Sequence, residues 1–269
     1  HATLRAMDAL GEKDVCLYVG IPFCPTRCAY CSFVSQSVEK SMALVPEFLQ
    51  ALAREIAATA EAVQRAGLRI VSLYIGGGTP TTLSARQLDA LCTQLEAAFD
   101  LSALREFTVE AGRPDTITAD KLQVLRAHRV DRISVNPQTL DDRVLETIGR
   151  RHTAQDIIDC FAVARAAGHK NINMDLIVGL PGEDREKVAH TLEKVEALNP
   201  DSLTVHSLAL KRATRLNLFK DKYQEISFEN SAEIMKMTMD SAHRMEMGPY
   251  YMYRQKNMAG NFENVGYAA

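Results

Sequence analysis

Six times along the chain, a short apolar run rich in β-branched residues is followed by a longer segment whose apolar positions recur every three to four residues. Patterns of this kind are typical of strands followed by amphipathic helices. The short runs predict strands at 15–21, 70–75, 106–111, 132–135, 171–178 and 202–207. The longer segments predict helices at 46–66, from 84 onward, and at 118–127, 141–148, 154–167, 184–197 and 229–245.

Strands that alternate with helices in this way predict a parallel sheet built from right-handed βαβ units. Helix-capping signals agree with the division: Ser84 and Gln87 have the spacing of a capping box, and Thr153 stands before another helix. Gly67 and Gly168 stand where helices are expected to end. Six units predict either an incomplete barrel or a doubly wound sheet, and periodicity alone does not choose between them. No repeat or Pro/Ser-rich linker divides the chain, so we interpret it as one domain.

One face of several predicted strands is polar when the strands are read with a period of two. A closed barrel normally fills its interior with apolar side chains, and parallel sheets are usually covered on both faces. A solvent-exposed face is the simpler alternative, but a polar ligand inside the sheet explains the pattern better. We therefore predict an α/β fold, a partial (β/α)6 TIM-like barrel with outer helices. The polar positions are Thr108, Glu110, Ser134, Asn136, Gln138, Asn171, Asn173, Asp175, Ser202, Thr204 and His206.

The composition of the 269 residues, with 46% hydrophobic and 24% charged residues, fits a folded globular protein. A net charge of −3 gives no electrostatic reason to expect a nucleic-acid or membrane-surface partner. No apolar run reaches the roughly 18–20 residues of a membrane span, and no signal peptide is evident. We therefore expect a cytoplasmic protein. Because the chain starts at His1 without a methionine and stops at Ala269 without a helix stop signal, we interpret it as a piece of a longer protein.

Three of the six cysteines, Cys24, Cys28 and Cys31, lie within eight residues of one predicted loop. Structural zinc sites use four ligands, usually from two C-x-x-C pairs, and the chain has no second pair. Iron–sulfur clusters also usually take four cysteines, so three would leave one iron open for catalysis. A zinc site completed by a distant histidine is the alternative, and we favour the cluster. We interpret Cys92 and Cys160 as buried apolar residues of helices.

The segment from Tyr18 to Cys24, together with the C-x3-C-x2-C spacing, resembles the radical S-adenosylmethionine (SAM) superfamily. Within it, the oxygen-independent coproporphyrinogen dehydrogenases are the most similar branch. The likeness spans about residues 15–209 in family order, and the segments 110–115 and 253–257 resemble the type often called HemZ. Further matching positions are 76–81, Glu110, Gln138, Arg150 and 175–182.

This resemblance implies a [4Fe–4S] cluster held by Cys24, Cys28 and Cys31, and a SAM molecule chelated to the open iron. In the superfamily the reduced cluster cleaves SAM to methionine and a 5′-deoxyadenosyl radical, which takes a hydrogen atom from the substrate. The protein positions these groups and excludes water and oxygen. An electron donor for the cluster is therefore an implied partner.

The resemblance also implies which residues contact SAM. Gly76, Gly77 and Gly78 would let the backbone approach the methionine ammonium group, with Thr79 alongside. Glu110 would accept hydrogen bonds from the ammonium group or the ribose, and Arg150 would pair with the carboxylate. Gln138 and Asp175 suit ribose hydroxyls, and the backbone of Ala209 would lie near the adenine. Three aromatic residues complete the expected cofactor site: Tyr18, Tyr30 and Phe33.

The implied activity is oxidative decarboxylation of two propionates of coproporphyrinogen III to vinyl groups, which gives protoporphyrinogen IX and needs an unidentified electron acceptor. Cationic candidates for binding this tetrapyrrole are Arg113, Lys211, Arg212 and Arg254. Two positions depart from the family pattern: Gly20 replaces a frequent histidine, and Phe33 replaces a non-ligating cysteine. The alternatives are therefore a haem-trafficking protein, another radical enzyme on a tetrapyrrole such as a ring-opening methyltransferase, and a metal-binding scaffold without turnover.

We divide the chain into a lead-in at 1–14, a radical SAM core at 15–245, and the start of a C-terminal family region at 246–269. Two histidines, His152 and His206, have side chains capable of acid–base chemistry. Because such histidines are more often hydrogen-bonded structural groups, they are not part of the expected site.

Overall fold

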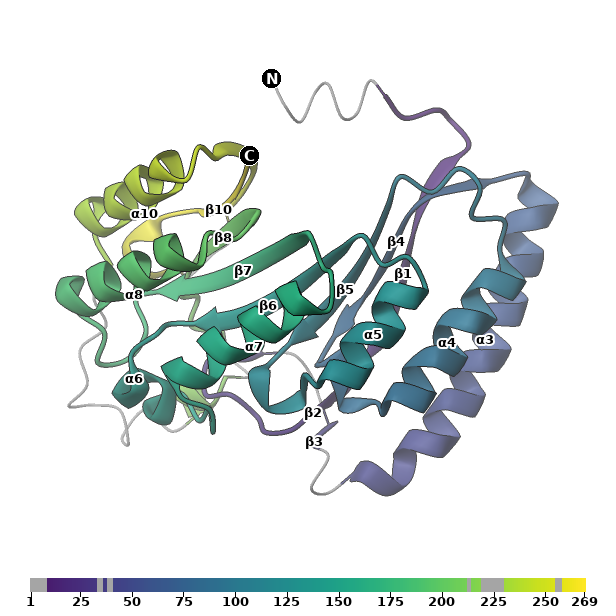
Figure 1. The fold of residues 1–269 in the computed structure, drawn as a ribbon, viewed down its shortest axis with the longest axis horizontal. Coiled ribbons are helices and arrows are strands. Elements are labelled where there is room, and N and C mark those ends of the chain that lie inside the picture. The colour runs from purple at the N-terminus through teal and green to yellow at the C-terminus, as the bar shows by residue number, and fades with distance from the viewer. Residues whose placement is uncertain (1–8, 33–35, 38–40, 212–213, 219–229, 255–257) are drawn as a thin grey trace.

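The computed structural model describes residues 9–32, 36–37, 41–211, 214–218, 230–254 and 258–269. Its main sheet contains eight strands: β1 (Asp14–Ile21), β4 (Arg69–Gly77), β5 (Glu106–Gly112), β6 (Arg132–Gln138), β7 (Asn171–Val178), β8 (Ser202–Ser207), β9 (Gly248–Tyr253) and β10 (Asn264–Ala268). Their spatial order is β1-β4-β5-β6-β7-β8-β10-β9, and the first six are parallel (Figure 1). A second sheet pairs two short strands, β2 (Phe23–Cys24) and β3 (Gln36–Ser37).

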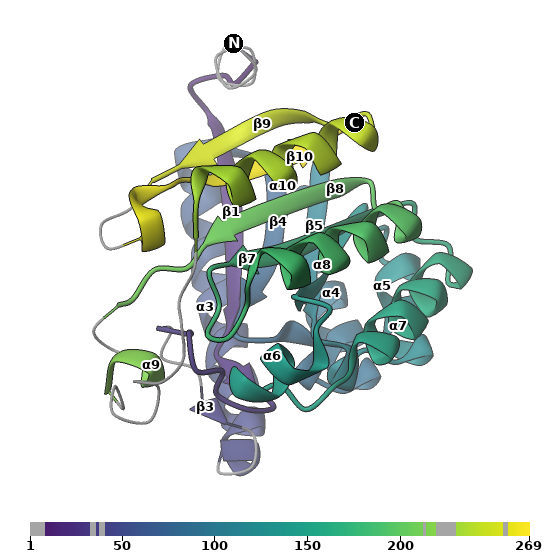
Figure 2. The ribbon, with the colours of Figure 1, turned by 90° about the vertical axis from the view of Figure 1, so that its left-hand side faces the viewer.

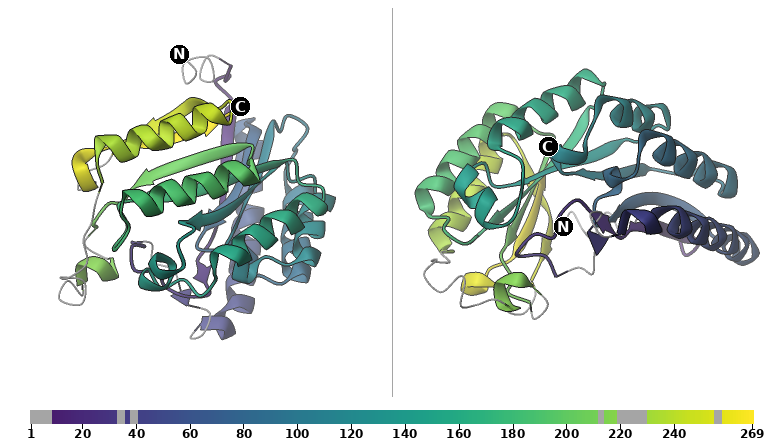
Figure 3. Two further views of the ribbon diagram at one scale, coloured as in Figure 1. Left: turned by 60° about the vertical axis from the view of Figure 1, so that its left-hand side comes forward. Right: turned by 90° about the horizontal axis from the view of Figure 1, so that it is seen from below.

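The sheet curls into an arc, and its outer side is followed by the longer helices (Figure 3). The helices are α3 (Val45–Ala66), α4 (Ala85–Ala98), α5 (Ala119–Ala127), α6 (Asp142–Thr147), α7 (Ala154–Ala166), α8 (Arg185–Leu198), α9 (Arg215–Leu218) and α10 (Ala232–Arg244). The short helix α9 lies beside the cysteine loop instead, where the Leu216 amide donates to the Ala29 carbonyl. Six parallel strands with outer helices and an incomplete closure confirm the predicted partial (β/α)6 barrel. Within the described part of the chain, none of these helices is long and apolar enough to cross a membrane.

The helix ends follow from local chemistry that the sequence already indicates. Ser84 Oγ accepts from the Gln87 amide, and the Gln87 side chain accepts from the Ser84 amide, so the capping box of α4 is complete. Thr153 and Asp156 form a second such box at the start of α7. Gly67 ends α3 with a left-handed φ of 61°, a conformation that glycine adopts without strain. These caps fix where each helix begins and ends relative to the sheet.

The outer face of the sheet is apolar and forms the core. Along β6, Ile133 and Val135 point to this side and are fully buried, and Leu122 of α5 is fully buried as well. Alternate residues of the same strand, Ser134 and Asn136, point to the inner side, because side chains alternate along a strand. The two sides of the sheet therefore differ in chemistry, and the inner side holds the polar residues.

Two antiparallel strands extend the sheet beyond β8 and were not predicted from the sequence (Figure 2). β10 pairs with β8, with Val265 opposite Val205, and β9 pairs with β10 and forms the edge. Their residues do not follow the strand–helix alternation of the preceding chain. The side chains of β9 are exposed, so this strand lacks the buried apolar run that predicts the parallel strands.

Candidate active site

A cavity of about 430 Å³ lies on the inner side of the curled sheet, where the parallel strands end. It is lined by all of the predicted cofactor and metal residues except two: Gly76 is not among the lining residues, and Phe33 lies outside the described residues. The predicted residues that line it are Tyr18, Cys24, Cys28, Tyr30, Cys31, Gly77, Gly78, Thr79, Glu110, Gln138, Arg150, Asp175 and Ala209. The topology thus brings together residues that lie more than two thirds of the chain apart, such as Tyr18 and Ala209.

The cysteine loop follows β2 and is tied to the chain before α7. Ala29 donates its amide to the Ile148 carbonyl at 2.9 Å, and Thr26 Oγ1 donates to the Gly149 carbonyl at 3.2 Å. All six cysteines are free thiols, so none of the three loop cysteines is used in a disulfide. Free thiols on one wall of a cavity are available to an inorganic centre.

The described residues contain no group of three His, Cys, Asp or Glu side chains already gathered around one point that a single metal ion would occupy. A structural zinc site draws its four ligands onto one atom. A four-iron cluster takes each cysteine on a different iron, so its thiolates stay further apart. Three free cysteines on the wall of the same cavity fit that second requirement.

The glycine-rich turn after β4 packs directly against the strands that carry the cysteine loop. Gly78 donates its amide to the Ile21 carbonyl, and Thr79 donates to the Phe23 carbonyl, both at 2.7 Å. A Cβ added to Gly78 would lie 2.5 Å from the Phe23 oxygen, and Gly77 has a φ of 109°. Glycine is therefore required here by the chain's own close approach, a reason that the sequence analysis did not give.

Gly76 has a different role from the two glycines that follow it. A Cβ at this position would lie 2.7 Å from the Tyr74 ring and 3.0 Å from the Glu110 carboxylate. The glycine thus leaves room for a hydrogen bond in which Tyr74 Oη donates to Glu110 Oε1 at 2.6 Å. Gly76 acts on the cavity through Glu110.

Glu110 is a carboxylate of the cavity wall whose two oxygens both accept hydrogen bonds. Besides the bond from Tyr74, its other oxygen accepts from the Gly77 amide at 3.2 Å. Burial raises the pKa of Glu110 to about 7, and the nearby charge of Asp175 acts in the same direction. Asp175 in turn accepts from Asn173 Nδ2 at 2.7 Å. Two carboxylates facing one cavity favour a cationic group between them.

Several buried polar atoms of the cavity wall lack a partner within the described chain. They are Gln138 Oε1, Asn136 Oδ1 and Arg150 Nε. Gln138 also has a left-handed φ of 69°, which is uncommon for a residue other than glycine and recurs at functional sites. Buried donors and acceptors without partners are costly, so a ligand with both kinds of polar group fits this wall. The amino, carboxylate and ribose groups of SAM are such a ligand.

Arg150 carries a buried charge beside the cysteine loop. Its Nη2 donates to Tyr30 Oη at 2.8 Å, and its Nη1 donates to the Asn136 carbonyl at 3.0 Å. These partners are a phenol and a carbonyl, and neither balances the charge of a guanidinium. A buried cation of this kind favours an anionic ligand or cluster next to it.

Tyr18, His206 and His152 are the remaining candidate residues to be placed relative to the cavity. Tyr18 lines the cavity and stacks on Tyr74, with ring centroids 5.8 Å apart. His206 also lines the cavity, a position that the sequence analysis did not include in the site. His152 is buried away from it, and burial together with the charges of Arg150 and Arg113 lowers its pKa to about 4.

The four cations predicted to bind the substrate fall in different places. Lys211 lines the cavity, and Arg212 lies outside the described residues. Arg254 is not among the lining residues and pairs with Glu263 at 3.1 Å. Arg113 lines the cavity, but it is 3% exposed and forms an ion pair with Asp115 at 2.9 Å. Among the described members of this set, Lys211 and the buried Arg113 are therefore the two that line the cavity.

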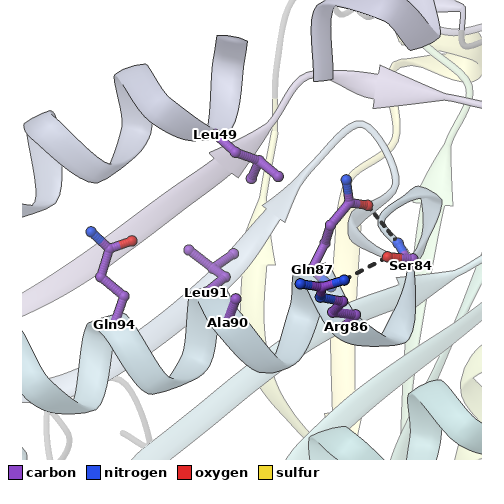
Figure 4. Close-up of a pocket in the computed structure, with 7 residues that line it drawn as sticks. All are labelled: Leu49, Ser84, Arg86, Gln87, Ala90, Leu91 and Gln94. Carbon is purple, nitrogen blue, oxygen red and sulfur yellow. Dashed lines mark hydrogen bonds between the residues drawn. The ribbon is translucent and has the colours of Figure 1, made fainter. Parts of the chain in front are cut away.

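A second hollow, of about 380 Å³, lies between α3 and α4 on the outer side of the sheet (Figure 4). Its polar residues Ser84 and Gln87 are hydrogen-bonded to each other in the capping box of α4. The remaining lining residues are Leu49, Arg86, Ala90, Leu91 and Gln94. This hollow has no cysteine or acidic residue in its lining, and it does not share the chemistry of the inner cavity.

Comparison with known proteins places the chain in a superfamily. The family model of the radical SAM superfamily matches residues 18–195, which include the cysteine loop, the second half of β1 and the complete strands β4, β5, β6 and β7. The chain therefore belongs to the radical SAM superfamily. Its cofactors are a [4Fe–4S] cluster and SAM.

Individual relatives show which branch of the superfamily the chain is similar to. The chain is 43% identical to the "oxygen-independent coproporphyrinogen-III oxidase-like protein HemZ" of Bacillus subtilis, over 96% of this chain and 52% of that protein. It is 35% identical to the "heme chaperone HemW" of the same organism, over 90% of this chain and 62% of that protein. The solved structure of coproporphyrinogen III oxidase (HemN) from Escherichia coli matches with a TM-score of 0.79 and 28% identity, over 98% of this chain and 58% of the other. The chain thus spans about half to three fifths of these relatives.

Proposed function

We propose that this chain is the cluster- and SAM-binding part of an enzyme that oxidatively decarboxylates coproporphyrinogen III to protoporphyrinogen IX. One observation carries the proposal: three free cysteines and the unpartnered polar groups of β6 and the α6–α7 connection line one cavity. The similarity to HemZ and to the coproporphyrinogen III oxidase of E. coli supports the choice of substrate.

Each wall of the cavity has a task in this proposal. Cys24, Cys28 and Cys31 hold the cluster, and when bound, the cluster and SAM supply the radical that takes a hydrogen atom from a propionate β-carbon. Glu110 accepts from the ammonium group of SAM, and Arg150 binds its carboxylate, since both are buried where an opposite charge is needed.

The remaining predicted residues orient the nucleoside part of SAM and shield the site. Gln138 and Asp175 bind ribose hydroxyls, and the backbone of Ala209 lies against the adenine. Gly77, Gly78 and Thr79 would contact the methionine part of SAM, and Tyr18 and Tyr30 would shield the site. Tyr30 is held by its bond with Arg150, and Tyr18 by its stack on Tyr74.

For the substrate, each propionate loses a hydrogen atom, releases carbon dioxide and passes one electron to an acceptor, which leaves a vinyl group. Lys211 is our candidate for binding a propionate carboxylate at the cavity mouth. A one-electron donor for the cluster is a further required partner. We also propose a cytoplasmic location, because six free cysteines and an iron–sulfur cluster suit a reducing compartment.

Haem trafficking is the second candidate function. It is favoured by the 35% identity to a haem chaperone over 90% of this chain. The two candidates differ in what they do with a tetrapyrrole: an oxidase converts coproporphyrinogen III, whereas a chaperone binds haem stoichiometrically and releases it unchanged.

The test is anaerobic reconstitution with iron and sulfide, followed by dithionite, SAM and coproporphyrinogen III. We expect 5′-deoxyadenosine formation that increases with substrate, together with a vinyl porphyrinogen product. Stoichiometric haem binding with no SAM cleavage would instead support trafficking. Cleavage of SAM with methyl transfer to a tetrapyrrole would support the methyltransferase alternative. The absence of a cluster, in a longer form of the protein as well, would contradict the proposal.

A further inference from the structure

Arg113 lies directly behind the cysteine loop, at a point where an arginine was expected to meet the substrate. It follows β5, whose last residue, Gly112, has a left-handed φ of 77° and turns the chain toward the loop. The side chain is buried, with 3% of its surface exposed. Because Arg113 is buried, the groups that its guanidinium contacts determine whether it can bind a substrate.

The contacts of Arg113 use both edges of its guanidinium. Nε and Nη2 donate to the two carboxylate oxygens of Asp115 at 3.0 and 2.9 Å, which is a bidentate pair. Nη1 donates to Thr26 Oγ1 at 2.7 Å and to the Thr26 carbonyl at 3.4 Å. The same nitrogen lies 3.6 Å from Cys28 Sγ and donates to it. Asp115 fixes the orientation of the fork so that its free edge faces the cysteine loop.

A second donor faces another sulfur of the same loop. Thr79 Oγ1 donates to Cys24 Sγ at 3.5 Å, and Thr79 is held by the bond from its amide to the Phe23 carbonyl. The sulfurs of Cys24 and Cys28 thus each receive a hydrogen bond from a residue outside the loop. One donor is charged and buried, and the other is a neutral hydroxyl.

These contacts leave little capacity for a substrate carboxylate at Arg113. Its fork is occupied by Asp115, and its remaining edge is occupied by Thr26 and Cys28. A group that donates to a cluster-ligating sulfur instead acts on the cluster, because hydrogen bonds to the sulfurs are one of the factors that set the reduction potential.

We propose that Arg113 is a positioning residue that raises the reduction potential of the cluster by donating to Cys28, and that Thr79 does the same more weakly through Cys24. Reduction adds one electron from an external donor and makes or breaks no bond. The added charge spreads onto the thiolate sulfurs, so a buried donor stabilises the reduced cluster more than the oxidised one. The inference rests on the proposed cysteine ligands and is independent of the substrate.

The test is a redox titration of the reconstituted full chain, followed by electron paramagnetic resonance. For Arg113→Gln we expect reduction to become about tenfold less favourable, which is a midpoint shift of about 59 mV to more negative values for one electron. Arg113→Lys keeps the charge without the fork and shifts less. Thr79→Val shifts in the same direction by a smaller amount. Loss of these hydrogen bonds also shifts the Fe–S(Cys) stretching bands in resonance Raman spectra.

The variant Asp115→Asn separates this inference from a structural role. It removes the negative charge that compensates Arg113, so the midpoint should move to more positive values, opposite to Arg113→Gln. A residue that only holds the loop would lower cluster content in both variants without opposite shifts. Arg165→Gln is the matched control, since Arg165 also pairs with an aspartate, Asp201 at 2.7 Å, but does not line the cavity.

Three results would overturn the inference. The first is a full cluster content in Arg113→Gln with an unchanged midpoint. The second is a lowered cluster content in which the remaining clusters titrate as in the unmodified protein. The third is the absence of a cluster in the unmodified protein, which would overturn the proposed function as well, whereas the first two leave the proposed function intact.

Discussion

The two faces of the parallel strands have opposite chemistry although alternate residues of the same strands form them. On the outer face, Ile133 and Val135 are fully buried against the helices and need no partner beyond close packing. On the inner face, Ser134 and Asn136 alternate with them, and each has a buried oxygen without a hydrogen-bond partner in the described chain. The outer face thus stabilises the fold, whereas the inner face is unfavourable until a ligand satisfies it.

Because side chains alternate along a strand, one set of residues can pack the core while the other set forms a binding site. A strand that supplied apolar side chains to both faces would be more stable but would have no site. The cavity wall of this chain accepts unpartnered polar groups, and the buried outer face compensates for their cost. Each prediction below changes one face and leaves the other intact.

The largest expected effect is the loss of the cluster on replacing Cys28 with serine. Cys28 and Cys160 are both buried thiols, 7% and 8% exposed, but only Cys28 lines the inner cavity. We expect Cys28→Ser to abolish cluster binding and to lower SAM cleavage by more than about 100-fold. Cys160→Ser is the control and should keep the cluster, because burial raises the pKa of that thiol to about 12 and its helix α7 packs on the outer side. Iron and sulfide analysis together with the visible spectrum measures both, and equal cluster content in the two variants would contradict the ligand assignment.

Neighbouring residues of β6 should give opposite effects on stability. Ile133→Ala removes a fully buried side chain from the outer core and should lower the free energy of unfolding by about 2–5 kcal/mol. Ser134→Ala removes a buried hydroxyl that has no partner, so its effect should lie between about zero and a gain of about 1 kcal/mol. Urea unfolding of the protein without SAM measures both values. A large destabilisation by Ser134→Ala would show that the inner face contributes to stability more than its contacts indicate.

The smallest of the three effects is a pH dependence caused by Glu110. Burial raises its pKa to about 7 in the folded protein, whereas an unfolded glutamate titrates near 4.3. The folded state therefore keeps a proton that the unfolded chain loses, and this stabilisation is complete below about pH 4.3 and is lost as the pH rises through about 7. We expect the stability of the unmodified protein relative to Glu110→Gln to fall by roughly 2–3 kcal/mol over this range.

Comparing the two proteins at each pH isolates Glu110 from other groups. Burial also raises the pKa of Glu183, to about 8, but this group is present in both proteins and cancels in the difference. If the difference in free energy of unfolding between the unmodified protein and Glu110→Gln does not change between pH 4 and pH 8, the buried, protonated state of Glu110 is contradicted. Thermal unfolding in a series of buffers at constant ionic strength is a sufficient measurement.

Much of the fold could be predicted because its signals are local. The strands at 171–178 and 202–207 were predicted with the bounds that the structure has, since each carries buried apolar residues at alternate positions between turn residues. The antiparallel pair β9–β10 could not be predicted, because β9 is exposed and its pairing depends on the position of β8. Exposure removes the hydrophobic pattern from which a strand is inferred.

The site was predictable to the extent that its residues form motifs. The cysteine spacing and the glycine run are contiguous in sequence, and the structure places them on one cavity, although their cofactor roles stay predictions. Asn136 was counted only as a polar strand position, and His206 was considered for acid–base chemistry but left out of the expected site. Arg113 was assigned to the substrate because a sequence shows its charge but not Asp115 folding back onto it. Contacts between segments remote in sequence, such as Arg113 with Thr26 and Cys28, leave no local pattern.

The two bonds that join the glycine turn to the strands before the cysteine loop have a consequence for how this protein can evolve. Because the amides of Gly78 and Thr79 bond the carbonyls of Ile21 and Phe23, the two motifs share one register. A residue inserted in either segment would displace the other, and a compensating change would have to arise more than fifty positions away. The two motifs are therefore a single heritable unit, whose length is fixed even where its side chains are free to vary.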